Sequence, residues 1–383
     1  MINITNKSQC TGCTACQQVC GHKAIGMHFD GYGHSYPVVD TNLCTNCGLC
    51  EKVCPMLHKD KIPTDTNLNK LKVYAVYNKD AEVRSKSTSG GVFSVLSKRI
   101  LEMGGVVYAA RFDEKYHILH DSFSSYDKIA PFRGSKYAQS DLGDTFKSIK
   151  KELKDKPVLF VGTPCQVAGL KSYLLMDYDN LYTCDFICMG ISSPVIWEKY
   201  LHEKWANYTI NKIFFKDKRN GWHNWKMLIN YNNNKEYLVK GGDDPFFYGY
   251  LSHLTYRASC FECPFRTCER ISDFTIADCW GIDKVHPEFD DNKGCTTLIL
   301  QSEKAQVLFD DIKCSLNWGE YDIEDVKKYN PYVVYKIQPH PKREEFYQRY
   351  KNDGYLKSTS IYMENKRTIC HKIKCKLKSI LKL

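Results

Sequence analysis

Two cysteine runs near the N-terminus share one spacing, and they constrain the fold of this chain more than any other feature. Each run reads Cys-x2-Cys-x2-Cys-x3-Cys, and the eight thiols are Cys10, Cys13, Cys16, Cys20, Cys44, Cys47, Cys50 and Cys54. This is the spacing that holds two [4Fe-4S] clusters in one small domain. Three thiolates at such short gaps wrap a loop around one cluster. We therefore expect a compact two-cluster domain over residues 1–58.

The fourth cysteine of each run is expected to bind the cluster of the other run, as in bacterial-type ferredoxins. One cluster would then use Cys10, Cys13, Cys16 and Cys54, and the other would use Cys44, Cys47, Cys50 and Cys20. Zinc or disulfides are the alternatives. Zinc sites pair their ligands two by two rather than repeating a three-plus-one run. The spacing therefore favours clusters.

Composition places the chain among folded proteins of a reducing compartment. A length of 383 residues, with 43% hydrophobic and 13% aromatic residues, predicts two or three globular domains. Iron–sulfur cysteines require reducing conditions, so we expect a cytoplasmic protein. No apolar run has the length of a membrane span. The net charge of +10 favours acidic redox partners or an anionic membrane surface. The sequence contains nothing that resembles a base-recognition motif of nucleic-acid-binding proteins, so no nucleic-acid partner is expected.

A polar stretch over residues 59–71 is expected to be a linker, and a second domain begins after it. The strand Val73–Tyr77 is followed by a loop of small hydroxyl residues that ends in Ser89, Gly90 and Gly91 and leads into a helix. Such a loop before a helix can cradle a phosphate or pyrophosphate. A plain N-cap with a flexible turn is the alternative.

A second loop, over residues 133–140, gathers donors and an aromatic ring. Lys136 could face a phosphate and Tyr137 could lie beside a cofactor ring. An ordinary polar surface loop is the alternative. By itself the sequence of this loop does not separate the two.

Four further cysteines outline a third site. Cys165 and Cys188 each lie at the end of an apolar strand, beside a turn that contains Gly162 or Gly190. This places them at the carboxyl edge of a sheet, where α/β proteins bind ligands. Cys260 and Cys263 form a Cys-x-x-Cys pair before a proline, which is a metal or redox signal. Three more cysteines compete for these places: Cys184, Cys268 and Cys279. The main alternative is that Cys268, and not Cys188, is the fourth cysteine of this site.

Two later stretches complete the chain. The region 212–250 is aromatic and basic and predicts a hairpin that turns at Asn232–Asn234. Residues 325–383 are expected to form a basic extension, which ends in an amphipathic pattern carried by Ile369, Ile373, Leu377 and Leu381. That pattern predicts either a helix on an acidic partner or membrane surface, or a solvated tail.

Taken together and in order, these later motifs resemble the beta subunit family of coenzyme F420 hydrogenases and dehydrogenases. The resemblance covers about residues 72–320 and rests on five motifs: Thr88-Ser89-Gly90-Gly91, Gly134-Ser135-Lys136-Tyr137, Gly162-Thr163-Pro164-Cys165-Gln166, Cys188-x-Gly190 and Cys260-x-x-Cys263. It implies a mixed α/β fold, FAD and a further [4Fe-4S] cluster. A small ferredoxin-like domain would thus precede a larger mixed α/β domain, with a flavin-binding part over 72–155 and a third-cluster part over 156–324.

The resemblance also implies roles for individual residues. The positions that match flavin-facing ones are Ser89, Gly90, Gly91, Ser135, Lys136, Tyr137 and Gln139. Thr163 and Gln166 flank the third cluster position, whose implied ligands are Cys165, Cys188, Cys260 and Cys263. No catalytic side chain is identified, because the redox chemistry belongs to the cofactors.

The sequence thus predicts an iron–sulfur flavoprotein oxidoreductase. It would pass electrons between a two-electron donor or acceptor, such as a deazaflavin or another soluble substrate, and one-electron clusters through FAD. Two alternatives remain. One is a ferredoxin-dependent reductase of a disulfide or small organic substrate, with Cys165 or a spare cysteine as the reacting thiol. The other is a non-catalytic electron-transfer subunit of a larger complex, with no substrate pocket of its own.

Overall fold

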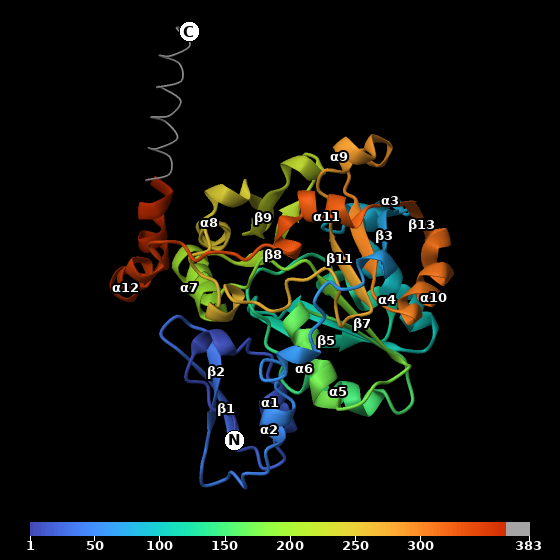
Figure 1. The fold of residues 1–383 in the computed structure, drawn as a ribbon. Helices are drawn as coiled ribbons and strands as arrows, with labels where there is room; N and C mark the ends of the chain where they lie inside the picture. The colour runs from blue at the N-terminus through green and yellow to red at the C-terminus, as the bar shows by residue number, and fades with distance from the viewer. Residues whose placement is uncertain (365–383) are drawn as a thin grey trace.

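The computed structural model describes residues 1–364, and the amphipathic pattern predicted around Ile369–Leu381 lies outside these residues. In Figure 1 a small N-terminal domain, coloured blue, lies below a larger body, in which the colours run on through green and yellow to red. In the described part, no helix has the length and apolar character needed to span a membrane.

The N-terminal domain is built from two short strands and two short helices around the cysteine runs. The antiparallel strands β1 and β2 pair from Ile25 with Val39 to Phe29 with Ser35. The elements of this domain are η1 (Lys7–Gln9), α1 (Ala15–Val19), β1 (Ile25–Phe29), β2 (Ser35–Val39) and α2 (Leu49–Lys52). The predicted linker holds only the short turns η2 (Lys59–Lys61) and η3 (Leu68–Lys70).

The body is organised by one eight-stranded mixed sheet in the order β13-β3-β12-β11-β7-β6-β4-β5. Its four central strands, β11, β7, β6 and β4, are parallel, and the outer ones are antiparallel. The strands are β3 (Lys72–Asn78), β4 (Val106–Phe112), β5 (Ile118–Phe123), β6 (Val158–Val161), β7 (Leu181–Phe186), β11 (Phe274–Asp278), β12 (Thr296–Leu300) and β13 (Leu316–Glu320). Strands from both 72–155 and 156–324 share this sheet, so the two regions form one folded unit.

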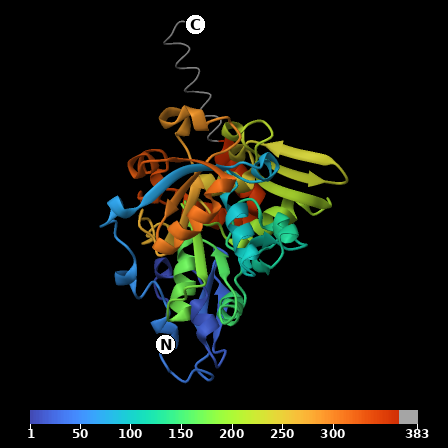
Figure 2. The same cartoon turned by 90° about the vertical axis from the view of Figure 1, so that its right-hand side faces the viewer.

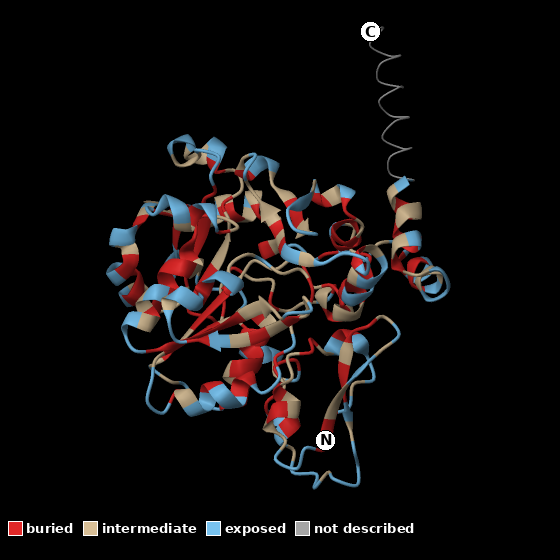
Figure 3. Ribbon diagram, turned by 180° about the vertical axis from the view of Figure 1, so that it is seen from behind, coloured by how far each residue is buried: buried red, intermediate tan, exposed pale blue. Residues whose placement is uncertain are grey.

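Helices cover both faces of this sheet, and the buried residues concentrate between the layers (Figure 3). One face packs against α4 (Val92–Glu102), α10 (Glu303–Ile312) and η4 (Tyr126–Phe132). The other face packs against α5 (Thr145–Glu152) and α6 (Pro164–Leu174) near β4 and β6, and against α9 (Ile282–Val285) and α11 (Ile323–Tyr329) near β3. Short elements α3 (Ala81–Ser85), η8 (Pro287–Phe289), η9 (Lys313–Ser315) and η10 (Pro331–Val333) complete the body.

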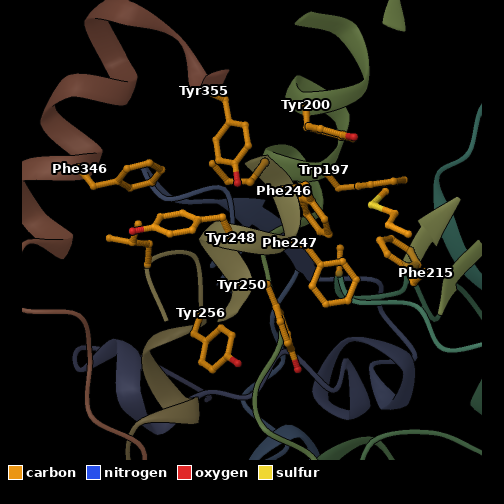
Figure 4. Packing of buried hydrophobic residues seen from close by; sticks show 14 of the residues in the cluster. Trp197, Tyr200, Phe215, Phe246, Phe247, Tyr248, Tyr250, Tyr256, Phe346 and Tyr355 are labelled. Atoms are coloured by element: carbon orange, nitrogen blue, oxygen red, sulfur yellow. The ribbon is translucent and has the colours of Figure 1, made fainter. Parts of the chain in front are cut away.

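A second, aromatic core lies beside the sheet, and Figure 4 shows its rings packed against one another. The three-stranded sheet β10-β9-β8 projects from this side, in yellow-green and yellow in Figure 2. Its elements are α7 (Pro194–Trp205), β8 (Ile210–Asp217), η5 (Trp222–Asn224), β9 (Lys226–Tyr231), β10 (Lys235–Val239), η6 (Gly241–Asp243), α8 (Pro245–Leu251), η7 (Ala258–Cys260) and α12 (Arg343–Asp353). The predicted hairpin is present, with Asn232–Asn234 in the left-handed region at the turn.

The mixed α/β class predicted from the sequence is confirmed, with a small ferredoxin-like domain in front. The expectation for 325–383 was incomplete. Phe346, Tyr347 and Tyr355 are fully buried in the aromatic core, so the described part of this extension belongs to the body.

Candidate iron–sulfur sites and cationic cavity

Four cysteines from both runs line one small cavity in the N-terminal domain, which we call site I. They are Cys10, Cys13, Cys16 and Cys54, the set expected from the ferredoxin spacing. Burial, with smaller contributions from the thiols of Cys54 and Cys10, raises the pKa of Cys13 to about 12. The Cys13 thiol therefore stays protonated unless a cationic group stabilises its thiolate. An iron–sulfur cluster is such a group, so the donor set fits it.

The other four cysteines, which we call site II, lie nearer the surface. Cys50 is buried with Ile2 and Ile25, and Cys20 packs against the same residues. The backbone amides of Ile2 and Asn46 donate to the sulfurs of Cys50 (3.3 Å) and Cys44 (3.4 Å). Cys47 is exposed. The amides point at the sulfurs as cluster-binding loops require, and the assignment of site II stays a prediction.

The body brings together the four cysteines predicted for a third site, which we call site III. Cys165 begins α6 after β6, Cys188 follows the neighbouring parallel strand β7, and Cys260 and Cys263 lie in and after η7. Burial, followed by the neighbouring Cys263 thiol, raises the pKa of Cys188 to about 11. Burial, followed by the thiols of Cys188 and Cys263, raises the pKa of Cys260 to about 12. The pKa of Cys165 is held well above its ordinary value by burial and by the three other thiols.

The three competing cysteines lie elsewhere. Cys184 is buried under the sheet face that packs on α4 and α10. Cys268 and Cys279 pack in the core beside β3 with Trp222 and Cys295. The placement favours Cys188 over Cys268 at site III. Among residues 1–364 no three His, Cys, Asp or Glu side chains are grouped closely enough to hold a single metal ion.

Sites I and III adjoin each other. Cys54 of site I and Cys165 and Cys263 of site III pack against one apolar cluster of Met56, Ile62, Ala168 and Phe265. Thr163 and Gln166 form a capping box at the start of α6, and the Thr163 hydroxyl lies 3.1 Å from the Cys165 sulfur. The capping box fixes the helix start that carries Cys165.

A cavity of about 1020 Å³ opens on the body beside β8. Nine Lys or Arg side chains line it against four Asp or Glu: Lys79, Arg84, Lys86, Arg133, Lys136, Lys212, Lys218, Arg219 and Lys293 against Asp113, Glu114, Asp217 and Asp291. Its volume is at the upper end of the range for small-molecule pockets, about 300–1,000 Å³. An excess of cations in a concave site attracts anionic ligands.

Two lysines of this cavity are held in place by backbone carbonyls. The Lys136 ammonium donates to the carbonyls of Pro131, Phe132 and Arg133 at 3.1–3.3 Å, and desolvation lowers its pKa to about 7. Lys218 donates to the carbonyls of Ser89 and Lys293, each at 2.6 Å. Desolvation, followed by the nearby Arg84, lowers the pKa of Lys218 to about 8.

The residues expected to face a flavin do not all lie at this cavity. Ser135 and Lys136 line it. Ser89, Gly90 and Gly91 lie behind it: the Ser89 carbonyl accepts from Lys218, the Gly90 amide donates to Thr296, and Gly91 is the N-cap of α4.

The other two residues point away from the cavity lining. The Tyr137 ring packs against Phe215, Phe247 and Tyr250, three rings labelled in Figure 4. Gln139 contacts the N-terminal domain instead, because its amide nitrogen donates to the carbonyls of Thr11 (3.1 Å) and Gly12 (3.3 Å).

Several residues of these sites carry no signal in the sequence. Arg257 is fully buried and reaches the sulfur of Cys10. Arg266 donates to the carbonyls of Met189 and Cys260 beside site III. A lone arginine far from any motif gives no indication of such a contact, so only the three-dimensional fold could identify these two.

Comparisons with known proteins match two parts of the chain. Residues 155–328 match the family described as the C terminus of the coenzyme F420 hydrogenase/dehydrogenase beta subunit. Residues 9–57 match the 4Fe-4S dicluster domain. No curated protein matches the chain. The solved structures that match include a chain of the F420-reducing [NiFe] hydrogenase complex from Methanosarcina barkeri. That chain is 14% identical, with a TM-score of 0.47, and the match covers 73% of this chain and 92% of that one.

The resemblance derived from the five sequence motifs is therefore confirmed, as is the iron–sulfur character of the N-terminal runs. Residues 155–328 are thus similar to the C-terminal part of coenzyme F420 hydrogenase/dehydrogenase beta subunits, and a 4Fe-4S dicluster domain over residues 9–57 precedes this region.

Proposed function

We propose that this chain is an iron–sulfur flavoprotein oxidoreductase. It would pass electrons between a two-electron donor or acceptor at the cationic cavity and one-electron carriers that meet the N-terminal domain. The observation that carries the proposal is the meeting of Cys165, Cys188, Cys260 and Cys263 beside site I. Four half-buried thiols beside the two-cluster domain would extend its series of clusters into the body.

The residues present fit the cofactors. Sites I, II and III would each hold one [4Fe-4S] cluster through four cysteines, and the cationic cavity would hold FAD with Ser135 and Lys136 in its wall. When bound, FAD supplies the exchange between two-electron and one-electron transfer, and the clusters supply one-electron transfer. The cations of the cavity would bind and orient the anionic groups of the dinucleotide and of a deazaflavin or similar substrate.

Other residues of the chain exclude water and fix positions. The rings of Phe215 and Tyr250 are buried, and the half-buried Tyr137 ring packs against both, so these rings would exclude water from the body behind the cavity wall. The parallel strands β6 and β7 deliver Cys165 and Cys188 to one sheet edge. The protein thus contributes placement and electrostatics, as expected where cofactors carry the chemistry.

The two alternatives are less well supported by the geometry. A thiol-based reductase needs an accessible thiol with a lowered pKa, whereas burial holds the pKa of Cys165 well above its ordinary value. A subunit without a substrate site has no use for a cavity of about 1020 Å³ lined by nine cations. A cytoplasmic location agrees with the reducing conditions that clusters need.

Anaerobic purification with iron and flavin analysis tests the proposal. We expect about twelve irons, four for each cluster, and one FAD per chain. About eight irons per chain with FAD present would show that site III holds no cluster. A chain without flavin would overturn the assignment of the cavity to FAD. Titration with F420, NADH and NADPH in turn then identifies the two-electron partner. If none of the three donors reduces the protein and no soluble substrate is turned over, the result would favour the non-catalytic subunit.

A further inference from the structure

Arg257 crosses from the body into the N-terminal domain. Its side chain is completely buried. The guanidinium donates to the carbonyls of Cys10 and Ser35, each at 2.7 Å, and to the Cys10 sulfur at 3.5 Å. It also lies over the Tyr36 ring, 4.2 Å from its centroid. A cation of the body therefore touches a cysteine of site I directly.

No carboxylate among residues 1–364 forms an ion pair with this guanidinium. The buried side chains that do form ion pairs in the described structure are those of other residues. Burying a charge without a partner costs a large desolvation free energy, so Arg257 requires some other compensating group. His34, which lies nearby, adds no negative charge, because burial and then Arg257 itself keep its pKa well below the ordinary value and its ring neutral. The group left to compensate the guanidinium is the sulfur it contacts, provided that sulfur is a thiolate.

Gln139 holds this arrangement in place. Its amide oxygen accepts from Arg257 at 3.2 Å, while its amide nitrogen donates to the carbonyls of Thr11 and Gly12. Gly12 has φ +70, and a Cβ there would lie 2.7 Å from the Gln139 amide nitrogen and 2.9 Å from the Arg257 guanidinium. Glycine at this position lets the loop approach the two side chains so closely.

We infer that Arg257, positioned by Gln139, is the buried counter-ion of the cluster at site I and raises the reduction potential of that cluster. The inference rests on the proposed function, because it requires a cluster at Cys10, Cys13, Cys16 and Cys54. Reduction adds one negative charge to the cluster, and a cation held against a ligand sulfur in a dry site favours the more negative form. Arg257 thus makes site I a better acceptor for electrons arriving from site III.

The test is a redox titration of the full, cluster-loaded chain, followed by low-temperature electron paramagnetic resonance. The site I signal is the one lost in Cys13→Ser. Removing the charge with Arg257→Gln should shift the one-electron equilibrium at site I toward the oxidised form by about tenfold or more, which corresponds to a fall of about 59 mV or more in potential. Arg257→Lys keeps the charge and should shift it less. Gln139→Leu leaves Arg257 unpositioned and should give an intermediate fall.

Arg343→Gln is the matched control. Arg343 is also a buried arginine that donates to a backbone carbonyl, that of Tyr256 at 2.8 Å, but no cysteine accepts from it in the described structure. The Arg343→Gln variant should have the same site I reduction potential as the parent chain, within the error of the titration.

The outcomes separate the inference from the proposed function. A parent chain without a cluster at site I overturns the proposed function itself. With that cluster present, an unchanged site I potential in Arg257→Gln overturns the role of Arg257. If Arg257→Gln loses the cluster, Arg257→Lys decides: a retained signal supports the need for a positive charge, and an equal loss overturns it.

Discussion

At the scale of single residues, the cationic cavity depends on a lysine whose charge changes near neutral pH. Lys136 has no carboxylate partner among the described residues and is held by three backbone carbonyls. Desolvation lowers its pKa to about 7. An anionic ligand beside the ammonium would favour the charged form and raise this pKa again. Ligand binding is therefore linked to proton uptake.

We predict that FAD binds more weakly as the pH rises above about 7. Below that pH Lys136 is protonated in both states, so its contribution to affinity is constant. Between about 7 and the higher pKa of the complex, binding must take up a proton, and the dissociation constant rises by up to about tenfold per pH unit. Flavin fluorescence titrations of the apo-flavoprotein across this range measure the dependence.

Lys136→Arg provides the control, because its charge does not titrate in this range. The pH dependence should flatten in this variant while affinity at low pH is retained. If the parent chain shows the same affinity at both ends of the range, Lys136 does not contact the flavin and the cavity wall must be reassigned.

The cysteines of site III give a second prediction at this scale. Replacing Cys165, Cys188, Cys260 or Cys263 by serine should remove about four irons per chain and one reduced-cluster signal. Cys268→Ser is the matched control, since Cys268 is a cysteine of the same region that lies away from site III and packs beside β3 with Trp222. Iron analysis after anaerobic purification compares them. Loss of iron in Cys268→Ser with full iron in Cys188→Ser would reverse the assignment.

Local spacing explains which site residues the sequence could predict. The cysteines lie in short motifs, where two intervening residues already bring two thiols together, and site I gathers the expected four. Gln139 was expected to face a flavin but contacts Thr11 and Gly12, 128 and 127 residues away. Neither this contact nor that of Arg257 with Cys10 follows from local pattern, because both depend on how two domains dock.

At the scale of elements, helix α6 links site III to site I. Cys165 lies in its first turn, and Gly169, four residues later, lies on the same face of the helix. A Cβ at Gly169 would lie 2.7 Å from the Cys13 Cβ and 2.9 Å from its sulfur. Glycine in mid-helix costs roughly 0.5–1 kcal/mol relative to alanine. The close approach of Cys13 explains why glycine, and not alanine, stands at this position in spite of that cost.

We predict that Gly169→Ala destabilises the chain although alanine favours a helix. The added methyl group must push the site I loop away, and overpacking typically costs about 1–3 kcal/mol. Iron content, the site I signal and the denaturant midpoint should all fall. Gly21→Ala in the N-terminal domain is the control, since nothing lies within 4 Å of its added Cβ. A Gly169→Ala chain with a raised midpoint and full iron would show that the loop adapts freely.

The elements themselves were largely predictable, whereas their arrangement was not. The apolar run Val73–Tyr77 predicted β3 to within one residue, and the apolar strands expected before Cys165 and Cys188 are β6 and β7, because strand periodicity is local. The sheet order places β12 and β13 beside β3, although more than 200 residues separate them in sequence. The burial of Phe346 and Tyr355 was likewise unforeseen, because polar neighbours hide these rings in the sequence.

At the scale of the whole molecule, the N-terminal domain docks on the body through contacts along its length. Ser193 donates to the carbonyl of Gly33 at 2.6 Å, and the amide of Phe146 donates to Gln18 at 2.8 Å. Tyr32 stacks on Tyr347 with the ring centroids 4.0 Å apart. Together with Arg257, these contacts hold site I against α6, so the placement of site I beside site III is part of the fold and does not depend on the linker alone.

The last prediction follows from this docking. If a specific protease site replaces the exposed turn Lys59–Lys61, cutting it should leave both parts associated, because the interface and not the linker holds them. The cut chain should elute as one species in anaerobic size exclusion, with all its iron and an unchanged site I potential. Arg257→Gln is the sensitising variant: it removes the guanidinium that holds Cys10 and Ser35, and it should promote separation after cutting. An iron-containing N-terminal fragment that elutes alone from the cut parent chain would show that the domain is only tethered.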